Sequence, residues 1–121
     1  MATVTMHRII IPDWVPVSVN QLTRSWRRAN RLKAHDREMV AVYARVQQVP
    51  AAICKRRVSV TITVDHAGHR PDPDNLLKSL LDALVQCGRL VDDSIQWCEL
   101  GPVVVEIGSM RQTVIQLEDV S

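Results

Sequence analysis

The chain has 121 residues, which is enough for one compact domain and too few for two. Hydrophobic residues make up 46% and charged residues 23% of it, proportions typical of a globular protein. No apolar run approaches the roughly 20 residues that span a bilayer, the first residues lack the pattern of a signal peptide, and the three cysteines are not in C-x-x-C spacing. We therefore expect one domain in a reducing cytoplasm, with no membrane segment, disulfide framework or zinc ribbon.

The net charge of +2 is unevenly distributed along the chain. Residues 1–57 contain eleven Lys/Arg and three Asp/Glu, whereas residues 58–121 contain four Lys/Arg and ten Asp/Glu, so the two parts carry +8 and −6. An acidic site beside a basic surface would suit a phosphodiester substrate. The alternative is a chance asymmetry that folding mixes in space.

The first half of the chain predicts a strand, a helix and a second strand. Residues 5–11 favour a strand that Pro12 closes. A helix is expected from about Lys33, and Pro50 ends it. Its predicted apolar face consists of Met39, Val42, Tyr43 and Val46. Residues 57–65 alternate as a half-buried strand, with one side formed by Val58, Val60, Ile62 and Val64.

The second half predicts a helix followed by strands. Residues 74–86 form an amphipathic helix that ends at Gly88. Its core stripe consists of Leu77, Leu80, Leu81 and Leu84, widened by Leu76 and Ala83. Residues 95–107 favour one or two strands broken at Gly101-Pro102, and a turn leads to a last strand at 112–118. The order β-α-β-α-β-β predicts a two-layer α+β domain, a mixed sheet with two helices packed on one face.

The acidic residues around the second helix have an ordinary structural explanation. Asp72 can cap the helix, Pro73 suits its first position, and Asp74 lies favourably at the positive end of the helix dipole. Asp92-Asp93-Ser94 is likewise a common turn composition. Each feature taken separately therefore requires no site.

The combination of these residues predicts more than a capped helix. If residues 72–74 are extended, the carboxylates of Asp72 and Asp74 point the same way, and Lys78 lies one turn further on. The helix travels about 18 Å, and residues 88–93, if extended, return about 17 Å. Asp92 or Asp93 can thus come back within one subunit, or a neighbouring subunit can supply the acid.

Three carboxylates and a lysine suit a hard divalent cation and a phosphate. Mg²⁺ prefers oxygen ligands and is usually held by one or two carboxylates together with substrate phosphate. Lys78 could stabilise charge that develops on the phosphate. A Ca²⁺ EF-hand is excluded because its loop pattern is absent, and His66 and His69 are better explained as polar surface than as ligands.

The segment RPDPDNLLKSLLDALVQCGRLVDDSIQ resembles the RusA-type Holliday junction resolvases. The shared features are the D-x-D-N-x-x-K motif, the DAL helix and the Asp-Asp pair, and they match without a gap. The resemblance covers roughly residues 70–97. It extends weakly to VPVSVNQL near the N-terminus, where Val17 replaces the second proline of the family pattern.

This resemblance implies a homodimeric, Mg²⁺-dependent endonuclease, with Mn²⁺ as a substitute, that cuts four-way DNA junctions by paired nicks. It assigns metal binding to three carboxylates: Asp72, Asp74 and Asp93. Lys78 would be the catalytic lysine, Asn75 would hold the loop by hydrogen bonds, and Asp92 is the alternative to Asp93. In this family dimerisation is thought to help build the metal sites.

The basic segment then predicts a DNA contact. Phosphate contacts, which are independent of base sequence, would come from Arg24, Arg27, Arg28, Arg31, Lys33 and Arg37, with a further contribution from Lys55-Arg56-Arg57. Trp26 either stacks on a base at the junction or anchors its loop to the core. Two other functions remain open: a catalytically inactive junction-binding dimer of the same fold, and a metal-dependent phosphohydrolase of small substrates.

Overall fold

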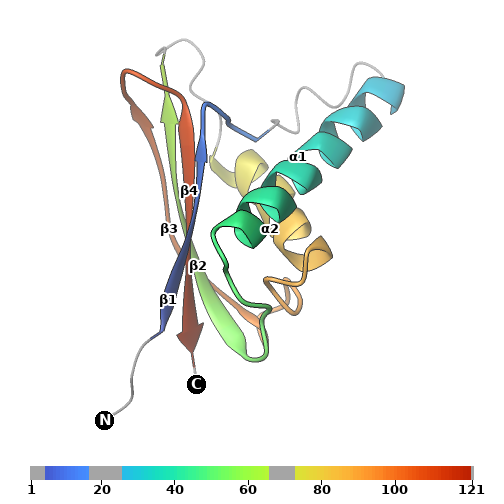
Figure 1. The fold of residues 1–121 in the computed structure, drawn as a ribbon, viewed down its shortest axis with the longest axis vertical. Coiled ribbons are helices and arrows are strands. Elements are labelled where there is room, and N and C mark those ends of the chain that lie inside the picture. The colour runs from blue at the N-terminus through green and yellow to red at the C-terminus, as the bar shows by residue number, and fades with distance from the viewer. Residues whose placement is uncertain (1–4, 17–25, 66–72, 121) are drawn as a thin grey trace.

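The computed structural model describes residues 5–16, 26–65 and 73–120 of the chain (Figure 1). Its elements follow the predicted order. They are β1 (Met6–Pro12), α1 (Trp26–Val46), β2 (Lys55–Val64), α2 (Pro73–Gln86), β3 (Cys98–Ile107) and β4 (Gln112–Val120). None of the helices in these residues is both long and apolar enough to cross a membrane.

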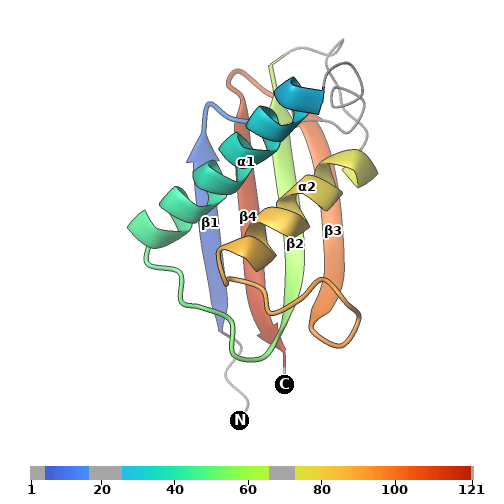
Figure 2. The same ribbon diagram turned by 90° about the vertical axis from the view of Figure 1, so that its right-hand side faces the viewer.

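The four strands form one mixed sheet in the order β1-β4-β2-β3. β2 and β3 are parallel and are joined through α2, while β4 runs antiparallel to both of its neighbours, β1 and β2. Both helices cover the same face of the sheet (Figures 1 and 2). The predicted two-layer α+β architecture is therefore confirmed.

The core lies between the sheet and the two helices, and the alternation of β2 was correctly predicted. Val58, Val60, Ile62 and Val64 are all buried. The stripe of α2 is also confirmed, although its centre is shifted: the fully buried positions are Leu76, Leu80, Ala83 and Leu84. Leu77 and Leu81 are partly buried against this cluster. Burial of these aliphatic side chains is the main favourable contribution to folding.

Two expectations for α1 were wrong. The helix begins at Trp26, well before Lys33. Its buried residues include Val40 and Ala44, whereas Val46 in the last turn is 70% exposed. Ala44 lies four residues after Val40, so both point to the sheet, while Val46 lies about 200° around the helix from Ala44. Met39 and Tyr43 of the predicted face are partly buried against the core, so the periodicity located the packing side in part and missed the fully buried Val40 and Ala44.

Both helices end in the same way, with a residue in the left-handed region. After α2, Gly88 has φ 79° and the N–H of Arg89 donates to the carbonyl of Leu84 at 2.9 Å. After α1, Gln48 has φ 58° and the N–H of Val49 donates to the carbonyl of Ala44, also at 2.9 Å. These are Schellman motifs. The predicted stop at Gly88 is confirmed, and Gln48 occupies a position that favours glycine.

β3 is a single strand with an irregularity where the sequence predicted a break. Val58 of β2 is opposite Leu100, but Val60 is opposite Val103, so β3 has one extra residue at Gly101-Pro102. A side chain at Gly101 would collide with Ser59 of the neighbouring strand. Glycine permits this close approach, and the bulge keeps the strand continuous.

Candidate functional site

The start of α2 carries the described part of the predicted D-x-D-N-x-x-K site. Asp74 lies in the first turn of this helix, and Lys78 lies one turn later; both are exposed. Side chains four residues apart share one side of a helix, so both can face the same bound phosphate. Asp72 lies outside the described residues, and the side chain of Asn75 is likewise not described.

Asp93 lies at the opposite end of α2. After Gln86 the chain turns: the N–H groups of Arg89 and Leu90 both donate to the carbonyl of Leu84. Asp93 then precedes Ser94, whose carbonyl accepts a hydrogen bond at 2.8 Å from the N–H of Cys98 at the start of β3. In Figure 2 this loop, in orange, lies beside the lower end of β3, away from the yellow first turn of α2.

The electrostatics of Cys98 agree with this placement. Burial raises the pKa of the Cys98 thiol, the nearby Asp93 carboxylate raises it further, and Lys55 acts in the opposite direction. Cys98 is opposite Arg56 near the beginning of β2, whereas α2 follows the end of β2. Asp93 is therefore next to the amino ends of the parallel strands, and Asp74 is near their carboxyl ends.

The return within one subunit, which extended residues 88–93 would have allowed, is therefore not what the structure shows. The helix between Asp74 and Asp93 rises about 18 Å over twelve residues, far more than the roughly 2.1 Å between Mg²⁺ and a ligand oxygen allows. Asp92 is exposed in the same loop and meets the same obstacle. Of the two predicted routes, a return of these acids to Asp74 within the same chain is not observed in the described residues.

The predicted basic segment forms the beginning of α1. Arg27, Arg31 and Lys33 are exposed there, and Figure 1 shows this end of α1 projecting away from the sheet. Arg37 is already engaged, because its Nε donates to Asp82 Oδ2 of α2 at 2.9 Å. Of the remaining predicted contacts, Arg24 lies outside the described residues. Trp26 and Arg28 belong to α1, but their side chains are not described.

The position of these cations works against the stability of α1. A helix start carries a partial positive charge that favours acidic residues and disfavours basic ones. The first turn of α1 contains no acidic residue. Exposed arginines at this end repel the helix dipole, but the same combination of cations and dipole attracts phosphate. The arrangement therefore lowers the stability of the helix start and leaves its positive charge exposed.

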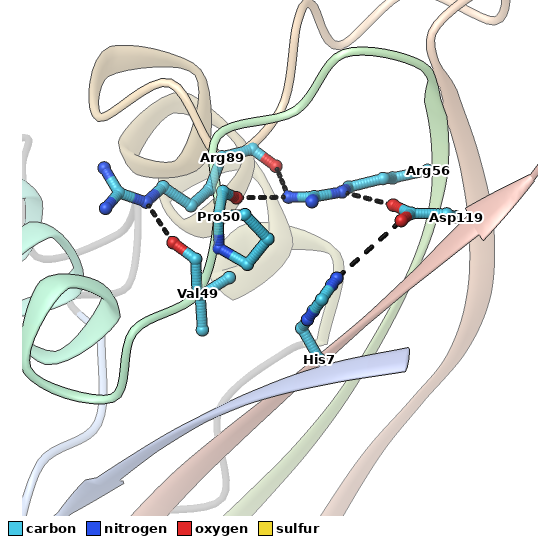
Figure 3. Close-up of polar contacts among 6 residues, drawn as sticks. All are labelled: His7, Val49, Pro50, Arg56, Arg89 and Asp119. Carbon is cyan, nitrogen blue, oxygen red and sulfur yellow. Dashed lines mark hydrogen bonds and ion pairs between the residues drawn. The ribbon is translucent and has the colours of Figure 1, made fainter. Parts of the chain in front are cut away.

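The predicted phosphate contact of Arg56 was wrong. Arg56 is 2% exposed, and its Nε donates to Asp119 Oδ1 at 2.7 Å (Figure 3). Its Nη1 donates to the carbonyls of Pro50 at 3.1 Å and Arg89 at 2.8 Å. Asp119 also lies 3.7 Å from Nε2 of His7. The guanidinium thus links Asp119 of β4 by hydrogen bonds to Pro50, which precedes β2, and to Arg89, which follows α2.

The alternation of β2 contained the signal for this buried arginine. Arg56 lies two residues before Val58 and therefore on the same side of the strand as the buried valines. Arg57 instead is exposed, on the face that the helices do not cover. Lys55 is half-buried near Cys98. The prediction treated Lys55-Arg56-Arg57 as one DNA-contacting surface, although successive residues of a strand face opposite sides of the sheet.

The donor chemistry at the start of α2 fits a hard cation only in part. Carboxylate oxygens such as those of Asp74 are ligands that Mg²⁺ prefers. Within the described residues of one subunit, however, no three His, Cys, Asp or Glu side chains come together as a metal site would require. Asp74 is the one carboxylate of the predicted set that the structure describes at this end of α2.

A scan against protein-family models finds no match to this chain. A search of curated proteins also finds no match.

Proposed function

We propose that this protein is a Mg²⁺-dependent endonuclease that acts as a homodimer on branched DNA, as its resemblance to RusA-type resolvases implies. The observation that carries the proposal is the pair Asp74 and Lys78 on one side of the first turns of α2. It is the described part of the motif that begins at Asp72. Both α1 and α2 begin toward the end of the molecule at which β2 ends (Figure 2), so the acidic site and the exposed cations of α1 would serve one substrate.

Each residue of the motif would have a distinct role. Asp72 and Asp74 of one subunit and Asp93 of the other would hold the metal, and Asn75 would support the loop. Bound Mg²⁺ supplies polarisation of a phosphoryl oxygen and activation of a water. The Lys78 ammonium would stabilise the negative charge that builds up on the phosphate in the transition state.

The beginning of α1 would bind the DNA backbone. Arg27, Arg31 and Lys33 are exposed, so phosphates can reach them without any rearrangement of the core. Contacts of this kind give affinity that is independent of sequence and falls steeply with salt. They suit an enzyme that selects its substrate by the shape of the DNA.

The two alternative functions have less support. An inactive DNA-binding dimer would use the arginines of α1 but would leave the combination of Asp74 with Lys78 unexplained. A phosphohydrolase of small substrates would use the carboxylates but not an arginine-rich helix end that projects from the sheet. The chain also contains no glycine-rich phosphate loop.

The test is cleavage of a four-way junction and of a linear duplex of the same sequence, each with Mg²⁺ and with EDTA. We expect Mg²⁺-dependent cleavage of the junction only, and loss of cleavage with retained binding in Asp74→Asn. Arg27→Gln should weaken junction binding, and Arg45→Gln is its matched control, because Arg45 is exposed in the last turn of α1, far from Arg27. Junction binding without cleavage by the wild-type protein would favour the inactive dimer. Hydrolysis of small phosphodiesters without any affinity for DNA would favour the phosphohydrolase.

A further inference from the structure

The face of the sheet that the helices leave uncovered (Figure 1) carries a hollow of about 290 Å³. The central strands β2 and β4 form its floor, and Met6 of β1 and Pro102 and Val104 of β3 stand at its sides. Small-molecule sites have volumes from roughly 300 Å³ upward, so the hollow suits a compact ligand. The floor residues are Arg57, Ser59, Thr61, Gln116 and Glu118.

The bulge in β3 makes room in this hollow. A Cβ atom on Gly101 would collide with Oγ of Ser59 and would lie 3.1 Å from Nε of Arg57. Because residue 101 is glycine, these two donor groups can lie together beside the bulge. Bulges often re-aim side chains next to functional sites, and a glycine within a strand permits close approach of another group.

Two opposite charges face the hollow. Arg57 of β2 and Glu118 of β4 are directly opposite each other in the register of the sheet, and both line the hollow. None of the ion pairs within the described residues joins these two side chains to each other or to a third group. A cation and an anion are therefore both available to one ligand.

Neutral hydrogen-bonding groups lie between these charges and the apolar side of the hollow. Ser59 is opposite Gln116, and Thr61 is opposite Val104. The orientation of the Gln116 amide follows from its hydrogen bonds: its oxygen accepts from Nε and Nη2 of Arg8 at 3.2 Å each. The NH₂ group of Gln116 is thereby left as a donor in the hollow.

We propose that this hollow binds a free α-amino acid with an apolar side chain. Its carboxylate would accept hydrogen bonds from Arg57 and Ser59, and its ammonium group would donate to Glu118. Charge-assisted hydrogen bonds of this kind are roughly twice as strong as neutral ones. The side chain of the ligand would lie against Val104 and Pro102. The site is separate from the proposed nuclease site, because Asp74 belongs to a helix on the other face of the sheet.

Other classes of ligand match these charges less well. Glu118 would repel the phosphate of a nucleotide or of DNA, as would Glu99 and Glu106 on the same face of β3. A metal ion would meet the charge of Arg57, and no three side chains of the described residues come together as its ligands. A purely apolar ligand would remove water from two charges without pairing them, which is costly. A zwitterion pairs both.

The test is a titration of the whole chain with L-leucine, followed by NMR of the backbone amides. We expect saturable shifts at Ser59, Thr61 and Gln116, with a Kd on the order of 1 mM because the ligand is small and the hollow is open. N-acetyl-L-leucine lacks the ammonium group and L-leucinamide lacks the carboxylate. Each should bind at least about tenfold more weakly, and these two compounds test the contacts without altering the protein.

Variants test the same contacts from the side of the protein. Arg57→Gln and Glu118→Gln should each weaken the binding of L-leucine by at least about tenfold. Glu106→Gln is the matched control, since Glu106 is exposed on the same face but does not line the hollow. It should bind as the wild type does.

Each contrary outcome would overturn the proposed site. Absence of saturable shifts at roughly 10 mM L-leucine would do so, as would equal binding of all three compounds. An equal loss of binding in Glu106→Gln would show that the effect is not specific to the hollow. Tighter binding of dAMP than of L-leucine would assign the hollow to nucleotides instead. Failure of junction cleavage would refute only the proposed nuclease, because the titration uses neither DNA nor metal.

Discussion

Mixing two inactive variants would reveal which subunit supplies Asp93. Asp74→Asn and Asp93→Asn should each lose at least about 100-fold of the cleavage rate when assayed alone, as expected for removal of a group that stabilises the transition state. If each site combines Asp74 of one subunit with Asp93 of the other, a mixed dimer contains one intact site. The second site of that dimer carries both substitutions and stays inactive.

The size of the recovery follows from symmetry. Equal amounts of freely exchanging subunits give about half mixed dimers, each with one of two sites intact, so about one quarter of the wild-type nicking rate should return. If both acids came from one subunit, every site would carry one substitution and nothing would return. The separation of the two residues by the whole of α2, which runs from Pro73 to Gln86, is the reason to expect recovery.

A plasmid with an extruded cruciform provides the assay. Wild-type protein should convert it to linear DNA by paired nicks, whereas the mixture should yield mainly nicked circles, because only one site per dimer is active. A mixture of Asp72→Asn and Asp74→Asn is the matched control, since both residues precede Lys78 on the same subunit and should not complement each other. Absence of recovery in the Asp74/Asp93 mixture, despite proven subunit exchange, would refute the shared site.

Three further predictions concern stability. Arg56→Ala should lower the free energy of unfolding by about 3–5 kcal/mol, because it removes the buried partner of Asp119 and the donor to the carbonyls of Pro50 and Arg89. Arg57→Ala should change it by less than about 0.5 kcal/mol. Equal effects in urea denaturation would contradict the role of the buried network. Gln48→Gly should stabilise the protein by about 0.5–1 kcal/mol and Gly88→Ala should destabilise it by about 1 kcal/mol, since both positions have positive φ. Thermal unfolding in which neither variant changes the melting temperature, or in which the signs are reversed, would contradict this reasoning. Burial raises the pKa of the Cys98 thiol above its ordinary 9.0. The contribution of the neutral thiol to the free energy of unfolding is therefore complete below the pKa of the unfolded chain and is lost as pH rises through the folded pKa. Cys98→Val should remove this part of the loss of stability above about pH 9, and an unchanged loss in the variant would assign it to other groups.

Local patterns determined most of the fold. The alternation of β2, the leucine stripe of α2 and the stop at Gly88 depend on side chains within a few residues of one another, and all three were predicted correctly. The motif at the start of α2 was visible for the same reason, because Asp74 and Lys78 are one helical turn apart. Short-range geometry of this kind is contained in the sequence.

Tertiary structure decided how distant elements meet. The sequence predicted a face of α1 that includes Met39 and Tyr43, and packing against the sheet and α2 buried Val40 and Ala44 as well and left Val46 exposed. Arginine is usually a surface residue, but the register of β2 with β4 places Arg56 beside Asp119. Residues 88–93 had the length to return to Asp74, yet hydrogen bonds to Leu84 turn the chain at the end of α2. Chain length limits how far a residue can reach, but only the packed structure determines where it goes.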